Sequence, residues 1–124
     1  MHLIIGGTYQ GKLDFAKENY RFTSEDIFAC TQEKIDFTKP CLTNIEEFTY
    51  GCILRDEDPV AVFVSRQDEW RNSVLIIDDI SGGVVPMNKT DRTWRSTTGK
   101  LCQYLSREAE KVSRIFCGLE QRLK

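Results

Sequence analysis

The chain has 124 residues, which is the size of one ordinary domain and enough to bury a core without disulfides or a structural metal. Its 17 Lys and Arg against 19 Asp and Glu leave a formal net charge of −2, which argues against binding nucleic acid through overall charge. No apolar run approaches the roughly 20 residues of a membrane span, and the N-terminus lacks the basic region of a signal peptide. We therefore expect one unit over residues 1–124, in the cytoplasm, with neither nucleic acid nor a membrane as its partner.

The first elements expected along the chain are a strand, a helix and a second strand. Residues 3–5 form a short apolar run that ends in Gly6-Gly7, which is typical of a buried strand entering a turn. Residues 12–19 have helical periodicity. Residues 26–31 contain the compact apolar run Ile-Phe-Ala-Cys, which predicts a second buried strand.

Two helices are expected in the middle of the chain. Thr43 with Glu46 three residues later has the form of a capping box, which predicts a helix through about Arg55. Residues 58–59 read Asp-Pro and favour another helix start, because proline at the first helical position loses no hydrogen bond. The β-branched run of residues 60–64 keeps a strand open as the alternative there.

The last third of the chain contains the clearest predicted strand, at residues 73–79. Its continuous apolar residues indicate burial on both faces, as in a parallel sheet covered by helices. Asn88 is expected to cap a long helix, and residues 115–117 to form a last short strand. The apolar stripe of that helix consists of Trp94, Leu101, Leu105, Ala109 and Val112. This alternation of strands and helices predicts an α/β fold with three layers and a mostly parallel sheet.

The cysteines indicate neither a zinc site nor a disulfide scaffold. They are odd in number and contain no Cys-x-x-Cys pair: Cys30, Cys41, Cys52, Cys102 and Cys117. We expect four or five buried or half-buried free thiols. His2 is the single histidine, so chemistry that needs a histidine must use it or be absent.

A phosphate-binding loop is predicted between the first strand and the first helix. The spacing is Gly-x-x-x-x-Gly-Lys, and the candidate phosphate-binding residues are Gly6, Gly7, Thr8, Tyr9, Gln10, Gly11, Lys12 and Leu13. Glycines let the backbone curl so that its N–H groups point at phosphate oxygens, while the lysine and the helix N-terminus add positive charge. The pattern predicts ATP or GTP as the ligand and a sheet of the P-loop nucleoside triphosphate hydrolase type, with a plain glycine turn as the alternative.

The magnesium site expected of such a loop is altered. Leu13 stands where a Ser or Thr hydroxyl ligates Mg²⁺, so we expect the Mg²⁺ site to be weakened. Asp79 ends the buried strand, at the place for an acid that holds Mg²⁺ or organises water. Asp78 and Asp79 are adjacent on a strand and point to opposite faces, so only one can face the loop, and Asp79 is the residue we select.

Two motifs resemble those of the bifunctional adenosylcobinamide kinase/adenosylcobinamide-phosphate guanylyltransferase family of cobalamin biosynthesis. The family's loop reads Gly-Gly-x-x-Ser-Gly-Lys-Ser, and its later signature reads Asn-Glu-Val-Gly-x-Gly-Ile-Val-Pro-x-Asn-x-x-x-Arg-x-Phe-Arg-Asp-x-x-Gly-x-x-Asn-Gln. Laid on the second pattern without a gap, Asp79 falls on its Glu, Val84 on its Ile and Trp94 on its Phe. The identical positions are Gly83, Val85, Pro86, Asn88, Arg92, Arg95, Gly99 and Gln103. The resemblance covers the first 20 residues and the chain from about Val74 to its end.

The middle of the chain departs from that family. The His-Arg-x-x-Arg-Pro stretch, whose histidine becomes guanylylated in the family, is absent, and His2 precedes the first predicted strand. The family's Asp-Cys-Leu-Thr strand is not recognisable either, which indicates a shortened middle. We therefore expect guanylyl transfer to be absent and kinase activity, with a cobinamide-type hydroxyl as acceptor, to be weakened.

The resemblance implies roles for four residues. Lys12 would hold the triphosphate, Asp79 would organise Mg²⁺ or the attacking hydroxyl, and Arg92 and Arg95 would stabilise the transferred charge. In the alternative interpretation, the two arginines are solvated surface residues. The resemblance also implies a nucleotide and a corrinoid substrate as partners, and a homo-oligomer. A non-catalytic relative that binds nucleotide or an anion and acts through protein contacts remains an alternative, as does a kinase with a different acceptor.

Overall fold

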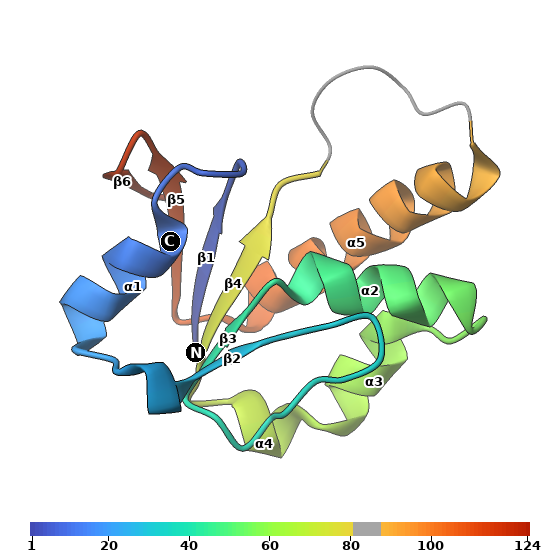
Figure 1. Cartoon of the computed structure of the whole chain (residues 1–124), viewed down its shortest axis with the longest axis horizontal. Coiled ribbons are helices and arrows are strands. Elements are labelled where there is room, and N and C mark those ends of the chain that lie inside the picture. Colours follow the sequence, from blue (N-terminus) through green and yellow to red (C-terminus); the bar gives the residue numbers. More distant parts are fainter. Residues whose placement is uncertain (81–87) are drawn as a thin grey trace.

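The computed structural model describes residues 1–80 and 88–124 (Figure 1). Its strands are β1 (His2–Gly6), β2 (Ile27–Ala29), β3 (Cys41–Thr43), β4 (Val74–Asp78), β5 (Lys111–Phe116) and β6 (Leu119–Arg122). Its helices are α1 (Lys12–Tyr20), α2 (Ile45–Leu54), α3 (Pro59–Ser65), α4 (Gln67–Trp70) and α5 (Lys89–Glu108), with a 3-10 turn at Ser24–Asp26. Among the described residues, no helix has both the length and the apolar composition needed to cross a bilayer.

The strands form a mostly parallel sheet in the order β2-β3-β4-β1-β5-β6. β1 lies at its centre and pairs in parallel with β4 and β5, whereas β6 runs antiparallel to β5. In the register of β1 with β4, Gly6 lies opposite Asp78. The segments that leave the carboxyl ends of β1 and β4 therefore start side by side, which is where open α/β sheets place their binding sites.

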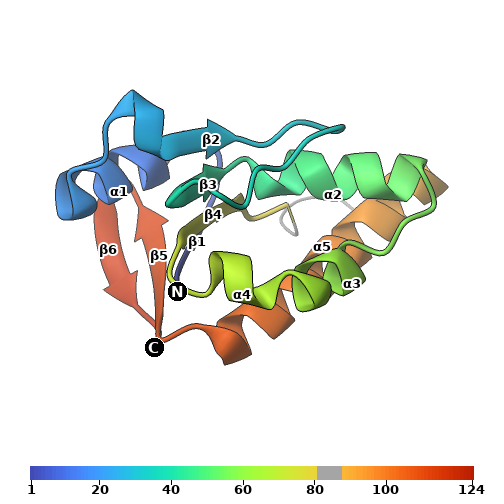
Figure 2. The same cartoon turned by 90° about the horizontal axis from the view of Figure 1, so that it is seen from below.

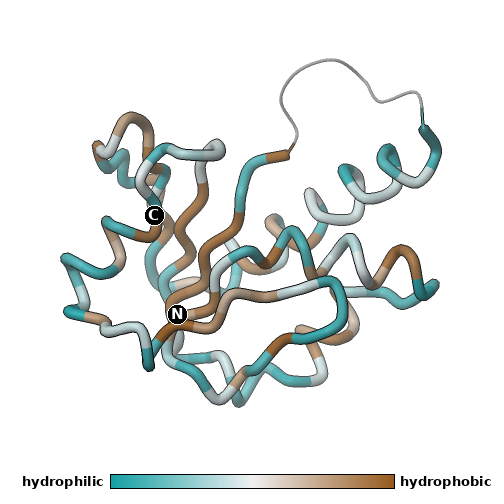
Figure 3. Tube along the Cα trace, viewed as in Figure 1, coloured by the Kyte–Doolittle hydropathy of each residue, from teal (hydrophilic) through white to brown (hydrophobic). Residues whose placement is uncertain are grey.

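Helices cover both faces of the sheet and complete the three-layer α/β fold expected from the sequence. One face carries α1 and the other carries α2, α3 and α5 (Figures 1 and 2). Strand β4 shows the division: Val74 and Ile76 join the hydrophobic cluster beneath α1, while Leu75 and Ile77 join the larger cluster on the opposite face. Figure 3 shows hydrophobic residues running along the central strands, as burial on both faces requires.

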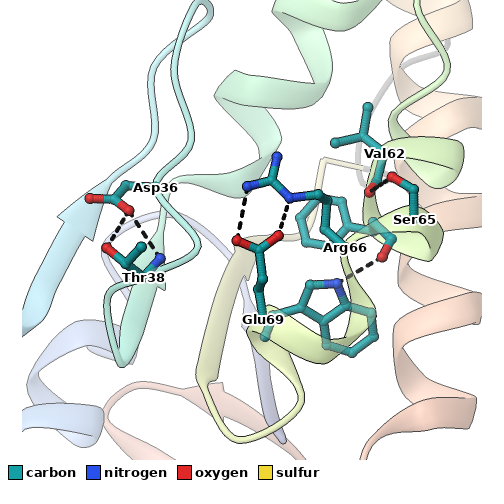
Figure 4. Close-up of polar contacts among 8 residues, drawn as sticks. Asp36, Thr38, Val62, Ser65, Arg66 and Glu69 are labelled. Atoms are coloured by element: carbon teal, nitrogen blue, oxygen red, sulfur yellow. Dashed lines mark hydrogen bonds and ion pairs between the residues drawn. The ribbon is translucent and has the colours of Figure 1, made fainter.

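Helices α3 and α4 meet at a corner that packs against the larger hydrophobic cluster, on the face of the sheet opposite to α1. The indole Nε1 of Trp70 donates to the carbonyl oxygen of Phe63 at 2.8 Å, and both side chains are buried. Arg66 and Glu69 form an ion pair on the outside of this corner (Figure 4). Hydrogen bonding of the indole allows this large polar-tipped side chain to be buried without an unsatisfied donor.

Several expected elements are confirmed. α1 and β4 lie where they were predicted, and α3 is a helix rather than the alternative strand. Asp58 caps α3 by accepting from Val60 N at 3.0 Å, and Asn88 caps α5 by accepting from Thr90 N at 2.7 Å. Of the five free cysteines, Cys117 is exposed and the others are buried or half-buried.

Other expectations are wrong, and tertiary packing explains the differences. Thr43 ends β3 instead of capping a helix, because α2 begins after Asn44 and the carboxylate of Glu46 bonds elsewhere. β3 reads Cys-Leu-Thr, so the strand that was not recognised in the sequence is present. β2 is the half-exposed edge of the sheet rather than a buried strand.

The carboxyl-terminal elements also differ from expectation. Ala109 is the C-cap of α5, and Val112 lies in β5, so the predicted apolar stripe spans two elements that share one core. The strand predicted at residues 115–117 is the end of the longer strand β5, which continues through a tight turn into β6. The family resemblance implied a closing strand in this last part of the chain, and β6 lies there.

Candidate functional site

The predicted phosphate loop joins β1 directly to α1, as its motif requires. Gly11 has φ +94° and Tyr9 has φ +61°, so the backbone curls through left-handed conformations before α1 begins. A Cβ on Gly6 would lie 2.5 Å from the carbonyl oxygen of Ile115, which leaves room only for glycine at the strand end. Tyr9 is fully exposed at the loop tip.

The loop rests on the turn between β5 and β6. Gly118 N donates to the carbonyl oxygen of Gln10 at 2.8 Å, and Cys117 N donates to its side-chain Oε1 at 2.7 Å. A Cβ on Gly11 would lie 3.4 Å from Gly118 Cα, which shows how closely the two turns approach. Residues from the end of the chain therefore fix the shape of a loop near its beginning.

The side chain of Lys12 is buried beneath the loop. The residue is 6% exposed, and its Nζ donates to the carbonyl oxygen of Gly7 at 2.6 Å. The same Nζ forms an ion pair with Asp78 Oδ1 at 2.6 Å. A curled loop at a helix N-terminus is an arrangement that binds anions in other proteins. Here the carboxylate of Asp78 balances the charge of the Lys12 ammonium.

Asp78, rather than Asp79, makes the carboxylate contacts with the loop. Besides pairing with Lys12, its Oδ2 accepts from Thr8 Oγ1 at 3.1 Å. The expectation that Asp79 faces the loop is therefore corrected: side chains alternate along β4, and Asp78 lies on the face that α1 covers. Asp79 follows the strand, and its backbone N donates to the carbonyl oxygen of Gly6 at 2.8 Å. Its role in holding Mg²⁺ stays a prediction.

Glu46 is a further acidic residue at this edge that sequence reasoning did not place in the site. It is 5% exposed, and its Oε1 accepts from Asp78 N at 2.8 Å, so α2 is tied to the end of β4. Burial raises the pKa of this carboxyl above its usual value, although the hydrogen bond from Asp78 opposes the shift. The sequence signal was the position of Glu46 in the first turn of a helix that follows a strand, but it was interpreted as part of a helix cap.

An open cleft of about 640 Å³ lies beside the loop. It is lined by Thr8, Tyr9, Gly11, Lys12, Leu13, Asp14, Lys17, Ser24, Ile27, Ala29, Thr43, Asn44, Ile76 and Asp78. The cleft thus combines the loop and α1 with the ends of β2, β3 and β4. Leu13 is among the lining residues, so an apolar side chain lies at the position where a typical phosphate loop has its magnesium-binding hydroxyl.

The structure does not bring Arg92 and Arg95 to this cleft. Both lie near the start of α5 and are not among the described residues that line the cleft. Figures 1 and 2 both place the start of α5 at the far end of the molecule from α1. The motif positions Gly83, Val84, Val85 and Pro86 lie outside the described residues.

The single histidine lies at the opposite end of β1 from the loop. His2 is 6% exposed; its Nδ1 hydrogen-bonds to Tyr20 OH at 2.6 Å and its Nε2 to Ser113 Oγ at 2.7 Å. Three strand residues lie between His2 and Gly6, so four steps of extended backbone place the two roughly 13 Å apart. Burial lowers the pKa of this imidazole. His2 opens β1 rather than preceding it, and it is a packed residue of that strand.

The carboxylates that the structure describes near the loop do not by themselves form a cluster that could hold a metal ion. Within residues 1–80 and 88–124, no group of three or more His, Cys, Asp and Glu side chains is arranged to hold a metal ion. Mg²⁺ is commonly held by one or two carboxylates together with substrate phosphates, and Asp78 offers a carboxylate beside the loop.

Comparison with known proteins identifies one family. The family model described as cobinamide kinase / cobinamide phosphate guanyltransferase matches residues 57–123, which is more than half of the chain. The matched range contains β4, α5 and the β5–β6 hairpin, whereas the loop of residues 6–13 precedes it. A search of curated proteins found no match.

Proposed function

The chain belongs to the cobinamide kinase / cobinamide phosphate guanyltransferase family, and on that premise we propose that it binds ATP or GTP at the loop of residues 6–13 and transfers a phosphoryl group to a hydroxyl of a corrinoid-type acceptor. The observation that carries this proposal is the burial of Lys12 beneath a curled loop between β1 and α1, with Asp78 beside it. The adjoining cleft provides space for an acceptor next to the bound phosphates.

In this proposal the chain acts mainly by positioning and by electrostatics. Backbone N–H groups of the loop and of the first turn of α1 bind phosphate oxygens, and Lys12 exchanges its contacts with Gly7 and Asp78 for the phosphates. Asp78 and Asp79 are the carboxylates that would hold Mg²⁺, which neutralises phosphate charge when bound. With Leu13 in place of a ligating hydroxyl, we expect Mg²⁺ affinity to be at least about tenfold weaker than in a loop that has one.

Guanylyl transfer through a histidine is not part of the proposed function. His2 lies roughly 13 Å from the loop along β1, and both of its ring nitrogens are already hydrogen-bonded. The family resemblance implies that Arg92 and Arg95 stabilise transferred charge, although neither is among the described residues that line the cleft. Alanine substitution of each would test that role, which predicts slower turnover with unchanged nucleotide affinity.

A non-catalytic nucleotide-binding or anion-binding protein is the second candidate. The apolar side chain of Leu13 at the cleft favours it, because phosphoryl transfer depends on a metal ion that bridges the phosphates. The two candidates differ in their dependence on Mg²⁺ and in whether a phosphorylated product forms.

Thermal unfolding with ATP or GTP, each with and without Mg²⁺, tests the binding step. A ligand at 100 times its Kd stabilises the fold by about 2.7 kcal/mol, which raises Tm by several degrees in a domain of this size. Lys12→Ala should abolish the shift. Lys34→Ala is the control for loss of a lysine, because Lys34 is exposed and is not among the described residues that line the cleft.

Transfer of labelled phosphate from the γ-position to cobinamide tests the chemical step. A Lys12-dependent Tm shift with no product would favour the non-catalytic candidate, and no shift with either nucleotide would overturn both candidates that bind nucleotide. Covalent labelling of the protein by α-labelled GTP would contradict the predicted absence of guanylyl transfer.

A further inference from the structure

The last residue of β3, Thr43, places a hydroxyl group in the floor of the cleft beside the loop. Thr43 is 7% exposed and is one of the residues that line this cleft. Side chains alternate along a strand, and Cys41 packs in the cluster beneath α1, so Thr43 points to the same face of the sheet as α1. Its register partner on β2 is Ala29, whose small side chain leaves the hydroxyl accessible from the cleft.

The hydroxyl of Thr43 forms no hydrogen bond with any residue that the structure describes, although the carbonyl oxygen of Thr43 accepts from Cys30 N at 2.8 Å. Every fully buried side-chain nitrogen and oxygen in the described part of the chain has a partner, so this unpaired oxygen is one that the cleft exposes. Valine has the shape of threonine and the same preference for strands, so the fold does not require a hydroxyl here. Buried polar groups are normally hydrogen-bonded, and a ligand in the cleft would supply the missing partner.

Asn44 adds a second polar side chain without a partner in the described structure. It is exposed, it lines the same cleft, and its side chain does not cap α2 although it stands at the N-cap position. Its φ of +58° is a left-handed conformation that asparagine tolerates better than most residues do. Its carboxamide both donates and accepts hydrogen bonds, as does the hydroxyl of Thr43. The two side chains together can therefore bind a ligand group that also donates and accepts.

The charges near Thr43 and Asn44 favour a ligand group without charge. Acidic side chains occupy the first turn of α2, at Glu46 and Glu47, and oppose the attraction of the helix N-terminus for anions. Neither of these acids is among the described residues that line the cleft, so they offer no carboxylate to a cation in it. Asp78, at the end of the neighbouring strand, is already paired with Lys12. A neutral hydroxyl or amide group is therefore the best complement.

The position of Thr43 and Asn44 places them beside the reacting groups rather than among them. Continuing the register of β3 with β4 puts Thr43 next to Ile76, two residues before Asp78. One strand spacing and two strand steps give a separation of roughly 8 Å between Thr43 and Asp78. We propose that Thr43 and Asn44 are specificity residues of the acceptor site, which hydrogen-bond a neutral hydroxyl or amide group next to the hydroxyl that receives the phosphoryl group. This role rests on the proposed function: the phosphates lie at the loop, and the acceptor lies over β2 and β3.

Equilibrium dialysis of cobinamide against the full chain tests this role without requiring turnover. Thr43→Val removes the hydroxyl and keeps the shape, and it should raise the Kd for cobinamide about three- to tenfold, the loss expected for one hydrogen bond. Thr43→Ser keeps the hydroxyl and should restore most of the affinity. Asn44→Gly, which suits the left-handed backbone, should weaken binding to a similar extent.

Three further measurements separate recognition of the acceptor from other effects. Thr97→Val is the matched control and should bind cobinamide as wild type does, since Thr97 is a half-buried threonine of α5 that is not among the described residues lining the cleft. The Tm shift of Thr43→Val with ATP or GTP should equal that of wild type, because Thr43 lies outside the loop. Lactamide should compete with cobinamide better than lactate does at equal concentration, because the two differ in carrying an amide or a carboxylate.

The outcomes distinguish this role from the proposed function. Unchanged cobinamide affinity in both Thr43→Val and Asn44→Gly would overturn the role and leave the proposed function intact. An equal loss of nucleotide binding in Thr43→Val would also overturn it, because the residue would then act at the phosphates. Competition by lactate equal to that by lactamide would overturn the preference for a neutral group. A wild type that shows the Lys12-dependent nucleotide shift but does not bind cobinamide would overturn both the corrinoid acceptor and its recognition by Thr43 and Asn44.

Discussion

Replacing Asp78 by Asn should destabilise the free protein because it removes the partner of a buried ammonium. The side chain of Lys12 is 7% exposed and that of Asp78 is 24% exposed. After the substitution, the Lys12 ammonium keeps the carbonyl oxygen of Gly7, at 2.6 Å, as a hydrogen-bond acceptor. Breaking a fully buried pair costs about 3–5 kcal/mol and breaking an exposed one about 0–1 kcal/mol. The partial exposure of Asp78 places this pair between the two, so we expect a loss of about 2 kcal/mol.

A double-mutant cycle separates this contact from other effects of the substitution. Lys12→Met removes the charge while keeping most of the apolar stem, and should cost about 1 kcal/mol, because Asp78 remains partly hydrated. The double variant Lys12→Met/Asp78→Asn should be more stable than the sum of the two losses predicts, by about 1 kcal/mol or more. Equilibrium unfolding in urea measures all four proteins. Single losses that add within about 0.5 kcal/mol would refute the coupling inferred from the geometry.

Three further predictions concern packing and pH. Gly51→Ala should destabilise the fold by about 3 kcal/mol, because the added Cβ would lie 1.7 Å from the backbone oxygen of Gln32. Gly99→Ala should instead stabilise the fold by about 0.5–1 kcal/mol, because Gly99 lies in the middle of α5 and the added Cβ would meet nothing within 4 Å. Urea unfolding measures both changes in stability. The pKa of Glu46 is higher in the folded than in the unfolded state, so wild type loses stability as the pH rises from 4.5 through the pKa of the folded state. Glu46→Gln should remove that loss. The variant should therefore be more stable than wild type at pH 7 but not below pH 4.5. The pKa of His2 is lower in the folded state, so stability should fall as the pH drops below 6.5, and His2→Asn should show a smaller change between pH 7 and pH 5 in the same assay.

Each of these predictions has an outcome that contradicts it. Equal effects of the two glycine substitutions would show that the contact with Gln32 relaxes without cost. A Glu46→Gln variant that is less stable than wild type at pH 7 would show that its carboxylate stabilises the fold in the charged form. An unchanged pH dependence in His2→Asn would assign the acid sensitivity to other groups.

Local sequence patterns predicted those features that depend on neighbouring residues alone. The loop spacing located the turn between β1 and α1, since its glycines and lysine lie within seven consecutive residues. The helix start at residues 58–59 and the cap at Asn88 were predicted correctly, because both depend on backbone groups within two or three residues. Thr43 and Glu46 show the limit of this reasoning. Their spacing fits a capping box, yet the strand pairing of β3 and the bond from Glu46 to Asp78 use both residues differently.

The sequence by itself determined that one of two adjacent acids would face the loop, because strand side chains alternate. Only the tertiary structure decided which one, since the answer depends on which face of β4 carries α1, and that is set by packing of the two hydrophobic clusters. Only the tertiary structure showed that β6 is the edge strand of the sheet. It also showed the hydrogen bond between Gln10 and Cys117, which lie 107 positions apart in the chain. Spacing along a chain encodes contacts within a turn or a helix, whereas contacts across the sheet exist only after long-range burial has brought the strands together.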